Sequence, residues 1–332
     1  MPLPDRAPGR FVATLLTIVA LTGAGCTGGS ADPTPTATAP SGVSVAEAQD
    51  VADQVVEGWS VAYGASWDAA AWDAVDTYPA RIADEAAIAT GTAQQQAGTY
   101  RASAFTNSFR VTSVYAHSET VGTEYLLVAG FYRNANRKPV ADSDAIHLYL
   151  REGSGAWRYA AGVGSEGVTG TTAARKGVAV SFTPLAEQPD VDVSMTGTNR
   201  ELLDALREAV QPGAQSATVT AQGTELTAGA EAWGGDFYSV RAAECSVPDG
   251  PAISTFGVQE GTLSLVQLDC DIELTTSSKT LIVWTDPVTG KQVLGSSAKL
   301  RVLYEALVRT DGSTYTVLAH YDRWASQPTV TK

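Results

Sequence analysis

The stretch Ser44–Gly64, SVAEAQDVADQVVEGWSVAYG, decides the fold. It has the pattern of an amphipathic helix, whereas the chain further on has the alternating pattern of β-strands. Ser44 and Glu47 form the Ser-x-x-Glu capping box that opens many helices. Apolar residues then recur at helical spacing, as expected for one buried face: Val45, Ala48, Val51, Ala52, Val55, Trp59 and Ala62. We expect two more helices, over about 67–77 and 81–89, separated by Pro79.

Beyond these helices the hydrophobic pattern changes to a period of two, which is typical of β-strands. Segment 109–115 alternates apolar and polar residues, and so does 145–150. Segment 125–132 is apolar at nearly every position, which favours a central strand covered on both faces. A Gly-Ser-Gly turn at 153–155 leads into a fourth strand over 157–161.

The same order of elements recurs in the second half of the chain. Residues 164–177 are rich in Gly, Thr and Ala and predict a linker, followed by a short strand over 178–182. Thr198 and Glu201 have the spacing of a second capping box, which opens a helix through Val210. Five strands are then predicted: 237–247, 261–275, 280–285, 299–309 and 314–324, the last two joined by an Asp311-Gly312 turn.

Helices followed by an antiparallel sheet define an α+β fold. This order resembles the NTF2-like (cystatin-like) superfamily, in which helices pack on a curved antiparallel sheet. The resemblance implies two such units in tandem, the first over 44–165 and the second over 198–327, with 166–197 as the linker between them. It rests on element order, so no functional residue is carried over from the superfamily.

The N-terminus has the pattern of a secretory signal peptide. Arg6 and Arg10 precede an apolar run over 11–21, and small residues lead into Cys26. The run is shorter than the roughly 20 residues that cross a membrane. The Ala-Gly-Cys end resembles the lipobox of bacterial prolipoproteins, which implies cleavage after residue 25 and a lipid on Cys26. The alternative is ordinary cleavage to a secreted protein with Cys26 as a free thiol.

Residues 26–43 predict a tether between that cysteine and the folded body. The segment is rich in Thr, Pro, Gly and Ala and has too little apolar surface to form a core. Proline-rich chain is extended, so the tether would reach about 50 Å. We therefore expect a protein anchored to the cell membrane by its N-terminal lipid, with its body on the extracytoplasmic side.

Charge and cysteine content narrow the functions to consider. The net charge is −14 and becomes −15 when residues 1–25, which hold Arg6, Arg10 and Asp5, are removed. An acidic protein is a poor ligand for nucleic acid, so no nucleic-acid partner is expected. Cys245 and Cys270 are the remaining cysteines, and an even pair in an exported chain predicts a disulfide. Two buried thiols or a redox pair are the alternatives.

Signatures of catalysis and cofactor binding are missing from the sequence. It has no G-x-S-x-G, no G-x-G-x-x-G and no P-loop pattern. Ser296 and Lys299 match S-x-x-K, but a strand follows them where the penicillin-binding proteins have a helix. The three histidines, His117, His147 and His320, lie apart in predicted strands. We therefore assign no catalytic, cofactor-binding or metal-binding residue.

Two further patterns have a functional and a structural interpretation. Asp269, Asp271 and Glu273 alternate along one strand and so share one face, which suits either a cation or a solvated surface. Five tryptophans suit either a ligand pocket or a core: Trp59, Trp67, Trp72, Trp233 and Trp284.

Three hypotheses about function remain. The first is a non-enzymatic envelope lipoprotein that binds a protein or envelope partner. The second is a module that binds a small apolar ligand in a cavity between helices and sheet. The third is an enzyme of unrecognised type that uses carboxylates such as Asp144 or Glu166 with a tyrosine.

Overall fold

The computed structural model describes most of the chain from Gly42 onward. The described residues are 42–65, 67–100, 105–120, 122–164, 182–214, 216–221, 238–276 and 281–331. Residues 1–39 form one unit and 40–332 another, and the description below concerns the second. The signal peptide, most of the tether and the strand predicted at 178–182 lie wholly or mainly outside the described residues.

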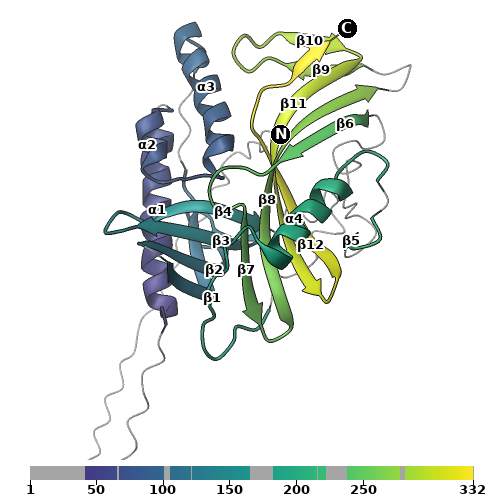
Figure 1. Cartoon of the computed structure of the whole chain (residues 1–332). Helices are drawn as coiled ribbons and strands as arrows, with labels where there is room; N and C mark the ends of the chain where they lie inside the picture. Colours follow the sequence, from purple (N-terminus) through teal and green to yellow (C-terminus); the bar gives the residue numbers. More distant parts are fainter. Residues whose placement is uncertain are drawn as a thin grey trace, which may run out of the picture. The chain divides into compact units, whose positions relative to one another are not determined.

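The fold is mixed α and β, with curled antiparallel sheets that hold most of the structured residues (Figure 1). The first sheet has the order β1-β2-β3-β4, and the second follows β5-β12-β11-β8-β6, with β7 and β13 paired to β8 and β11. Helices are α1 (Val45–Gly64), α2 (Ala69–Asp73), α3 (Arg81–Ala97) and α4 (Gly197–Ala209). The strands of the first sheet are β1 (Ser108–Thr120), β2 (Thr123–Arg133), β3 (Pro139–Glu152) and β4 (Arg158–Gly164).

The second half is richer in strands than its sequence pattern indicates. Its longer strands are β6 (Tyr238–Ser246), β7 (Ile253–Val258), β8 (Gly261–Thr276), β11 (Ser297–Asp311) and β12 (Thr314–Trp324). Its short strands are β5 (Val219–Ala221), β9 (Ile282–Thr285), β10 (Gln292–Gly295) and β13 (Thr329–Thr331). β9 and β10 form a separate two-stranded sheet. Strands β5, β7, β10 and β13 were not predicted, because each is short or interrupted by glycine.

The three largest apolar cores of the described residues hold these layers together. One lies between α1–α3 and the first sheet, and another lies between α4 and the second sheet. The third is shared, because side chains of β1–β4 pack directly against side chains of β7, β8, β11 and β12. The apolar strand predicted at 125–132 fits this arrangement: Leu126 and Val128 join the helix core, and Leu127 and Ala129 join the shared one. The two halves therefore exclude water from a common interface.

Helix ends show where local sequence rules held and where they failed. The capping box of Ser44 and Glu47 is present, with the Glu47 amide 3.2 Å from the Ser44 hydroxyl. The second capping box is wrong: α4 starts at Gly197, and its N-cap Thr196 makes no side-chain cap. Asn199 faces inward instead and donates to the carbonyl of Ser194 at 2.9 Å. A buried side-chain amide needs hydrogen-bond partners, and this requirement outweighs the local capping pattern.

The helices predicted at 67–77 and 81–89 also differ in extent. α2 has only five residues, because the chain after Asp73 leaves the helix to run beside β4. α3 continues to Ala97, beyond the predicted end, on residues such as Ala and Gln that favour helix. It includes Gly91, where an added Cβ would lie 2.0 Å from the Trp67 ring. Glycine at this position lets α3 pack directly on the tryptophan.

Candidate functional site

The predicted cysteine pair forms a cross-strand link in the second sheet. Cys245 on β6 and Cys270 on β8 occupy directly paired positions, and their sulfur atoms are 2.03 Å apart. Both side chains are buried in the core beneath α4. Cys26, the predicted lipidation site, lies outside the described residues, so its modification stays a prediction.

A buried group of charged side chains lies where the two halves meet. We call it the junction cluster and define it as Asp76, Asp84, Glu305 and Arg323. Asp76 follows α2 and Asp84 belongs to α3, whereas Glu305 is on β11 and Arg323 on β12. The three acids are at most 8% exposed. The cluster thus joins helical segments of the first half to strands of the second half.

Asp76 is fixed in place by the strand beside it. The backbone on either side of this residue pairs with Tyr159 of β4, through bonds of 2.8 Å to Val75 and Thr77. The indole of Trp59 donates to the Asp76 carboxylate at 2.7 Å. Burial raises the pKa of Asp76 well above its ordinary value of 3.8, and the nearby charge of Asp84 raises it further.

The carboxyl groups of Asp76 and Asp84 interact with each other, and this interaction raises the pKa of Asp76. Burial also raises the pKa of Asp84, although Arg323 opposes this shift. Burial and the neighbouring carboxyl thus both favour the protonated form of Asp76. Two carboxyls this close cannot both ionise in a dry site without a large free-energy cost.

Glu305 and Arg323 form the ionic half of the cluster. The guanidinium donates to both carboxylate oxygens, at 2.8 and 3.3 Å. Glu305 is completely buried and also accepts the backbone N–H of Gly162 at 3.1 Å. The Arg323 guanidinium lies 5.7 Å from the ring centre of Tyr159, within cation–π range. The pair therefore links the second sheet to the first, Glu305 through the backbone of Gly162 and Arg323 through the ring of Tyr159.

A neutral histidine lies beside the cluster. His147 stacks on Phe109 with ring centres 4.1 Å apart, and its nitrogens contact the hydroxyls of Tyr149 and Tyr132 at 3.0 and 3.3 Å. Burial lowers the pKa of His147 to about 3, and the charge of Arg323 lowers it further. The imidazole is therefore uncharged at physiological pH, with one nitrogen donating and the other accepting.

A carboxyl that holds its proton at neutral pH could act as an acid in a reaction, provided that a substrate reached it. Asp76 and Asp84 line none of the main hollows on the surface of the described residues, and neither does His147. The geometry therefore supports a structural role for the junction cluster. The sequence contains a hint of this cluster. Glu305 interrupts the apolar run 302–308 of β11, and Arg323 lies on the strand paired with it.

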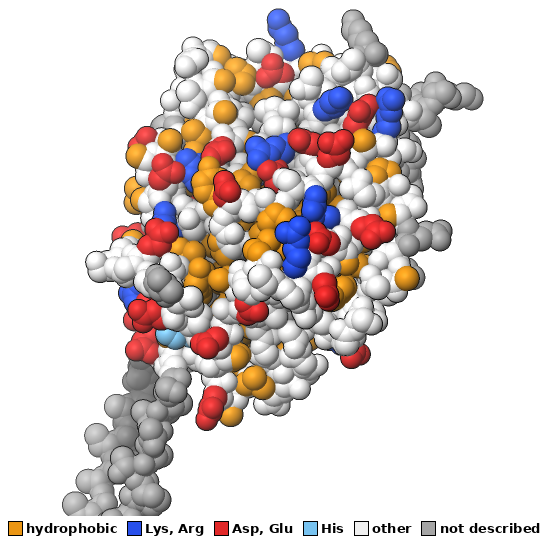
Figure 2. Space-filling model, viewed as in Figure 1, with side chains coloured by type: hydrophobic (Ala, Val, Ile, Leu, Met, Phe, Trp, Pro, Cys, Tyr) orange, Lys and Arg blue, Asp and Glu red, His pale blue; other side chains and the backbone are white. Residues whose placement is uncertain are grey.

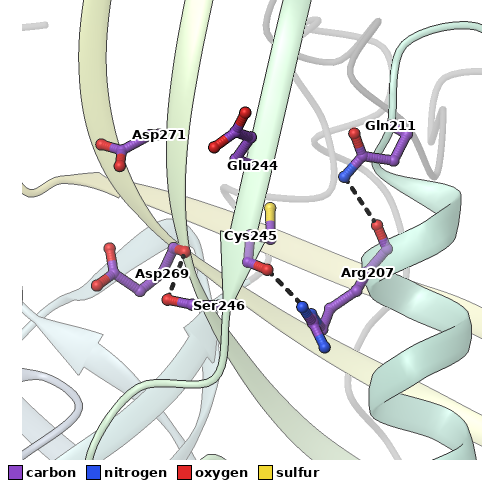
Figure 3. A pocket seen from close by; sticks show the side chains of 7 residues that line it. All are labelled: Arg207, Gln211, Glu244, Cys245, Ser246, Asp269 and Asp271. Atoms are coloured by element: carbon purple, nitrogen blue, oxygen red, sulfur yellow. Dashed lines mark hydrogen bonds between the residues drawn. The ribbon is translucent and has the colours of Figure 1, made fainter.

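The hollow in Figure 3 wraps around β6, the edge strand of the second sheet, and has a volume of about 420 Å³. Arg207 and Gln211 of α4 lie on one side of this strand, and acidic side chains lie on the other (Figure 3). Arg207 donates to the carbonyl of Cys245 at 2.9 Å. Glu244 and Asp271 occupy directly paired positions.

The acidic strand of β8 is confirmed as one solvent-side face with an apolar reverse face. Asp269, Asp271 and Glu273 are half-buried or exposed, whereas Cys270 and Ile272 are buried. Basic side chains of neighbouring strands form ion pairs with two of these acids. Arg301 contacts Asp269, and both Arg241 and Lys299 contact Glu273. Within the described ranges, no three His, Cys, Asp or Glu side chains are grouped to hold a metal ion.

Charged side chains of both signs are mixed over the second sheet, whereas the area beside the start of α1 is mostly acidic (Figure 2). Exposed apolar side chains concentrate on the small hairpin of β9 and β10. Leu281 and Val283 are 52% and 53% exposed, and Leu294 is 46% exposed. Such a concentration is uncommon on a protein surface and marks sites of contact with other molecules.

The tryptophans, for which the sequence left a pocket and a core as alternatives, lie in different parts of the fold. Trp59, Trp67 and Trp72 pack in or against the helix core. Trp284 lies on the hairpin and contacts Trp324 of β12, with ring centres 5.0 Å apart. Trp233 and Glu166 lie outside the described residues. Asp144 is half-buried on β3, and the three histidines lie in β1, β3 and β12, as expected.

Among the described helices, none is long and apolar enough to cross a membrane. No protein-family model matches the chain, and no curated protein does. A search of solved structures returned an "Ntf2 like protein involved in plasmid conjugation", which is 11% identical and has a TM-score of 0.18. That match covers 84% of this chain and 97% of the other. A structural similarity this low gives no information about the function of this chain.

Proposed function

We propose that this chain is a lipid-anchored protein of the bacterial cell envelope whose folded body binds another protein rather than catalysing a reaction. The observation that carries the binding role is the exposed apolar hairpin of β9 and β10, defined by Leu281, Val283 and Leu294. A surface of this kind is costly to leave in water, so its presence favours a partner that covers it.

The position of the hairpin suits this role. The chain enters the body at Val43, beside the start of α1, and the hairpin lies at the opposite end of the fold (Figure 1). Gln188 holds the entry point, because its side-chain amide accepts from the Val43 N–H at 3.0 Å and donates to the Val43 carbonyl at 2.7 Å. The hairpin thus lies far from the point at which the tether would join the body.

The signal sequence and Cys26 support the anchor, and the Cys245–Cys270 pair supports an oxidising compartment outside the cytoplasm. Growth with an alkyne-labelled palmitate tests the anchor. The full chain should incorporate the label and stay with the membrane fraction, whereas C26S should do neither. A labelled C26S protein would show that the lipid is attached to another residue.

Photo-crosslinking in intact cells tests the binding surface. A photoreactive amino acid at Val283 should yield an adduct with a protein, and the same residue at Val61 should not. Val61 is a suitable control because it is 61% exposed on α1. Equal adduct yields at the two positions would remove the hairpin as the binding surface.

A further inference from the structure

Strand β9 presents an unprotected edge. Within the described part of the chain it pairs with β10 alone. Proteins usually protect such edges with charged side chains, proline or bulges, since an open strand invites pairing with another chain. The segment Leu281–Thr285, LIVWT, contains no charge and no proline.

Two longer edge strands of the same molecule, β6 and β1, have the usual protection. β6 carries Arg241 and Glu244, and it has a register irregularity near Val240. β1 carries Arg110 and Glu119 and has two such irregularities along its pairing with β2. Strand β9 lacks the charged side chains that these two strands carry.

The hairpin is held firmly by the rest of the fold. Its turn accepts hydrogen bonds from Gln94 and Thr99 at the end of α3, at 2.7 Å to Pro287 and 2.9 Å to Val288. At its other end, a Cβ on Gly295 would lie 2.2 Å from the Thr331 carbonyl, so the hairpin packs tightly on β13. The edge is thus presented in a fixed position.

The two faces of the hairpin differ in what they contact. Val283 is directly opposite Leu294, and Leu281 lies on the same face two residues away, so these three side chains form the exposed apolar face. Trp284 is opposite Val293 on the other face and contacts Trp324. The first face is the more exposed of the two, since Val293 and Trp324 on the second are 39% and 40% exposed.

We propose that β9 pairs antiparallel with β9 of a second copy of this chain, across a two-fold axis at Val283. A two-fold contact requires a surface that complements itself. An antiparallel pairing centred on Val283 meets this requirement, because it places Leu281 and Val283 of both copies on one continuous face. The two hairpins would then form a four-stranded sheet, which is more stable than an isolated pair of strands.

Charge favours a second copy at this surface. Two chains with a net charge of −14 repel each other over most of their surfaces. From Leu281 to Gly295 the only charged residues are Asp286 and Lys291, which cancel. Like-charged copies can therefore approach with little repulsion at the hairpin. This inference rests on the proposed binding role, and a shared lipid anchor would raise the effective concentration of the copies.

Cysteine crosslinking of the full chain in intact cells tests the pairing. V283C, treated with a short bis-maleimide, should give a product of twice the chain mass, and its yield should exceed that of V61C at least fivefold. Addition of L281K to V283C should reduce the yield to the level of V61C, because a charge at the paired edge opposes association. Circular dichroism of each variant checks that it is folded.

The outcomes separate this inference from the proposed function. Product of twice the mass from V283C alone supports pairing with a second copy. Product of another mass, containing a different protein, overturns the second copy but leaves the hairpin as the binding surface. Absence of any product above the V61C level overturns the pairing. The palmitate experiment on Cys26 tests the lipid anchor independently of this result.

Discussion

Two arginine–carboxylate pairs of the second sheet have the same chemistry in different surroundings. Glu305 of β11 pairs with Arg323 of β12, and Asp269 of β8 pairs with Arg301 of β11. In each pair the guanidinium contacts both carboxylate oxygens. In the first pair, the side chain of Glu305 is fully buried and that of Arg323 is 19% exposed. In the second pair, the side chain of Asp269 is 12% exposed and that of Arg301 is 40% exposed.

The comparison teaches that location decides what an ion pair contributes. Near the surface, water screens both charges and replaces a lost partner, so a pair contributes at most about 1 kcal/mol. In the interior no water takes that place, and the loss of one partner leaves an uncompensated charge. Glu305 also anchors Gly162 of the first sheet, so the buried pair belongs to the contact between the two halves.

The largest effect is expected from R323M. It removes the base that pairs with Glu305, and we expect the free energy of unfolding to fall by about 3–5 kcal/mol. Urea denaturation followed by tryptophan fluorescence measures this loss. The double variant E305L/R323M should lose much less, because the buried charge of Glu305 is removed as well. If R323M costs less than about 1 kcal/mol, the pair behaves like a surface pair and the comparison fails.

The next largest effect concerns the cross-strand link beneath the exposed pairs. C245S/C270S should lower the free energy of unfolding by about 3 kcal/mol, since the unfolded chain gains the freedom of a loop of 25 residues. A reducing agent should produce the same loss in the parent protein and none in the double variant. A parent protein whose stability ignores the reductant would show that the link contributes nothing.

The strand pattern was readable from the sequence because buried and exposed side chains alternate along it. The disulfide followed from the cysteine count, and the apolar segment at 125–132 indicated a strand covered on both faces. The junction cluster was not predictable, because it depends on residues such as Gly162 and Glu305 that are 143 positions apart. Local rules also misplaced the start of α4, where the partners of Asn199 decide the geometry.

A smaller effect is expected from the pH dependence of Asp76. Burial raises the pKa of this carboxyl above 3.8 in the folded state, so the folded chain binds the proton more tightly than the unfolded chain. The contribution of Asp76 to the free energy of unfolding is therefore complete at low pH. It is lost as pH rises from about 4 toward the raised pKa of the folded state. D76N should remove this loss and be more stable than the parent at pH 8.

Denaturation curves between pH 4 and 8 check this prediction. The stability of D76N should depend less on pH than that of the parent. D50N, at an exposed position of α1, is the matched control and should leave the pH dependence unchanged. If the stability of D76N falls with pH as steeply as that of the parent, Asp76 holds no proton in the folded state.

The smallest effect is expected from R301M, which repeats the first substitution at the exposed pair. The Arg301 side chain is 40% exposed and that of Asp269 is 12% exposed, so the free energy of unfolding should fall by less in R301M than in R323M. At about 1 M salt the Debye length is about 3 Å, and the difference from the parent should shrink further. The loss in R323M should persist at the same salt concentration, because mobile ions do not reach a buried charge. Denaturation of both variants at low and high salt therefore tests the comparison directly, and equal losses that respond equally to salt would show that burial does not distinguish the two pairs.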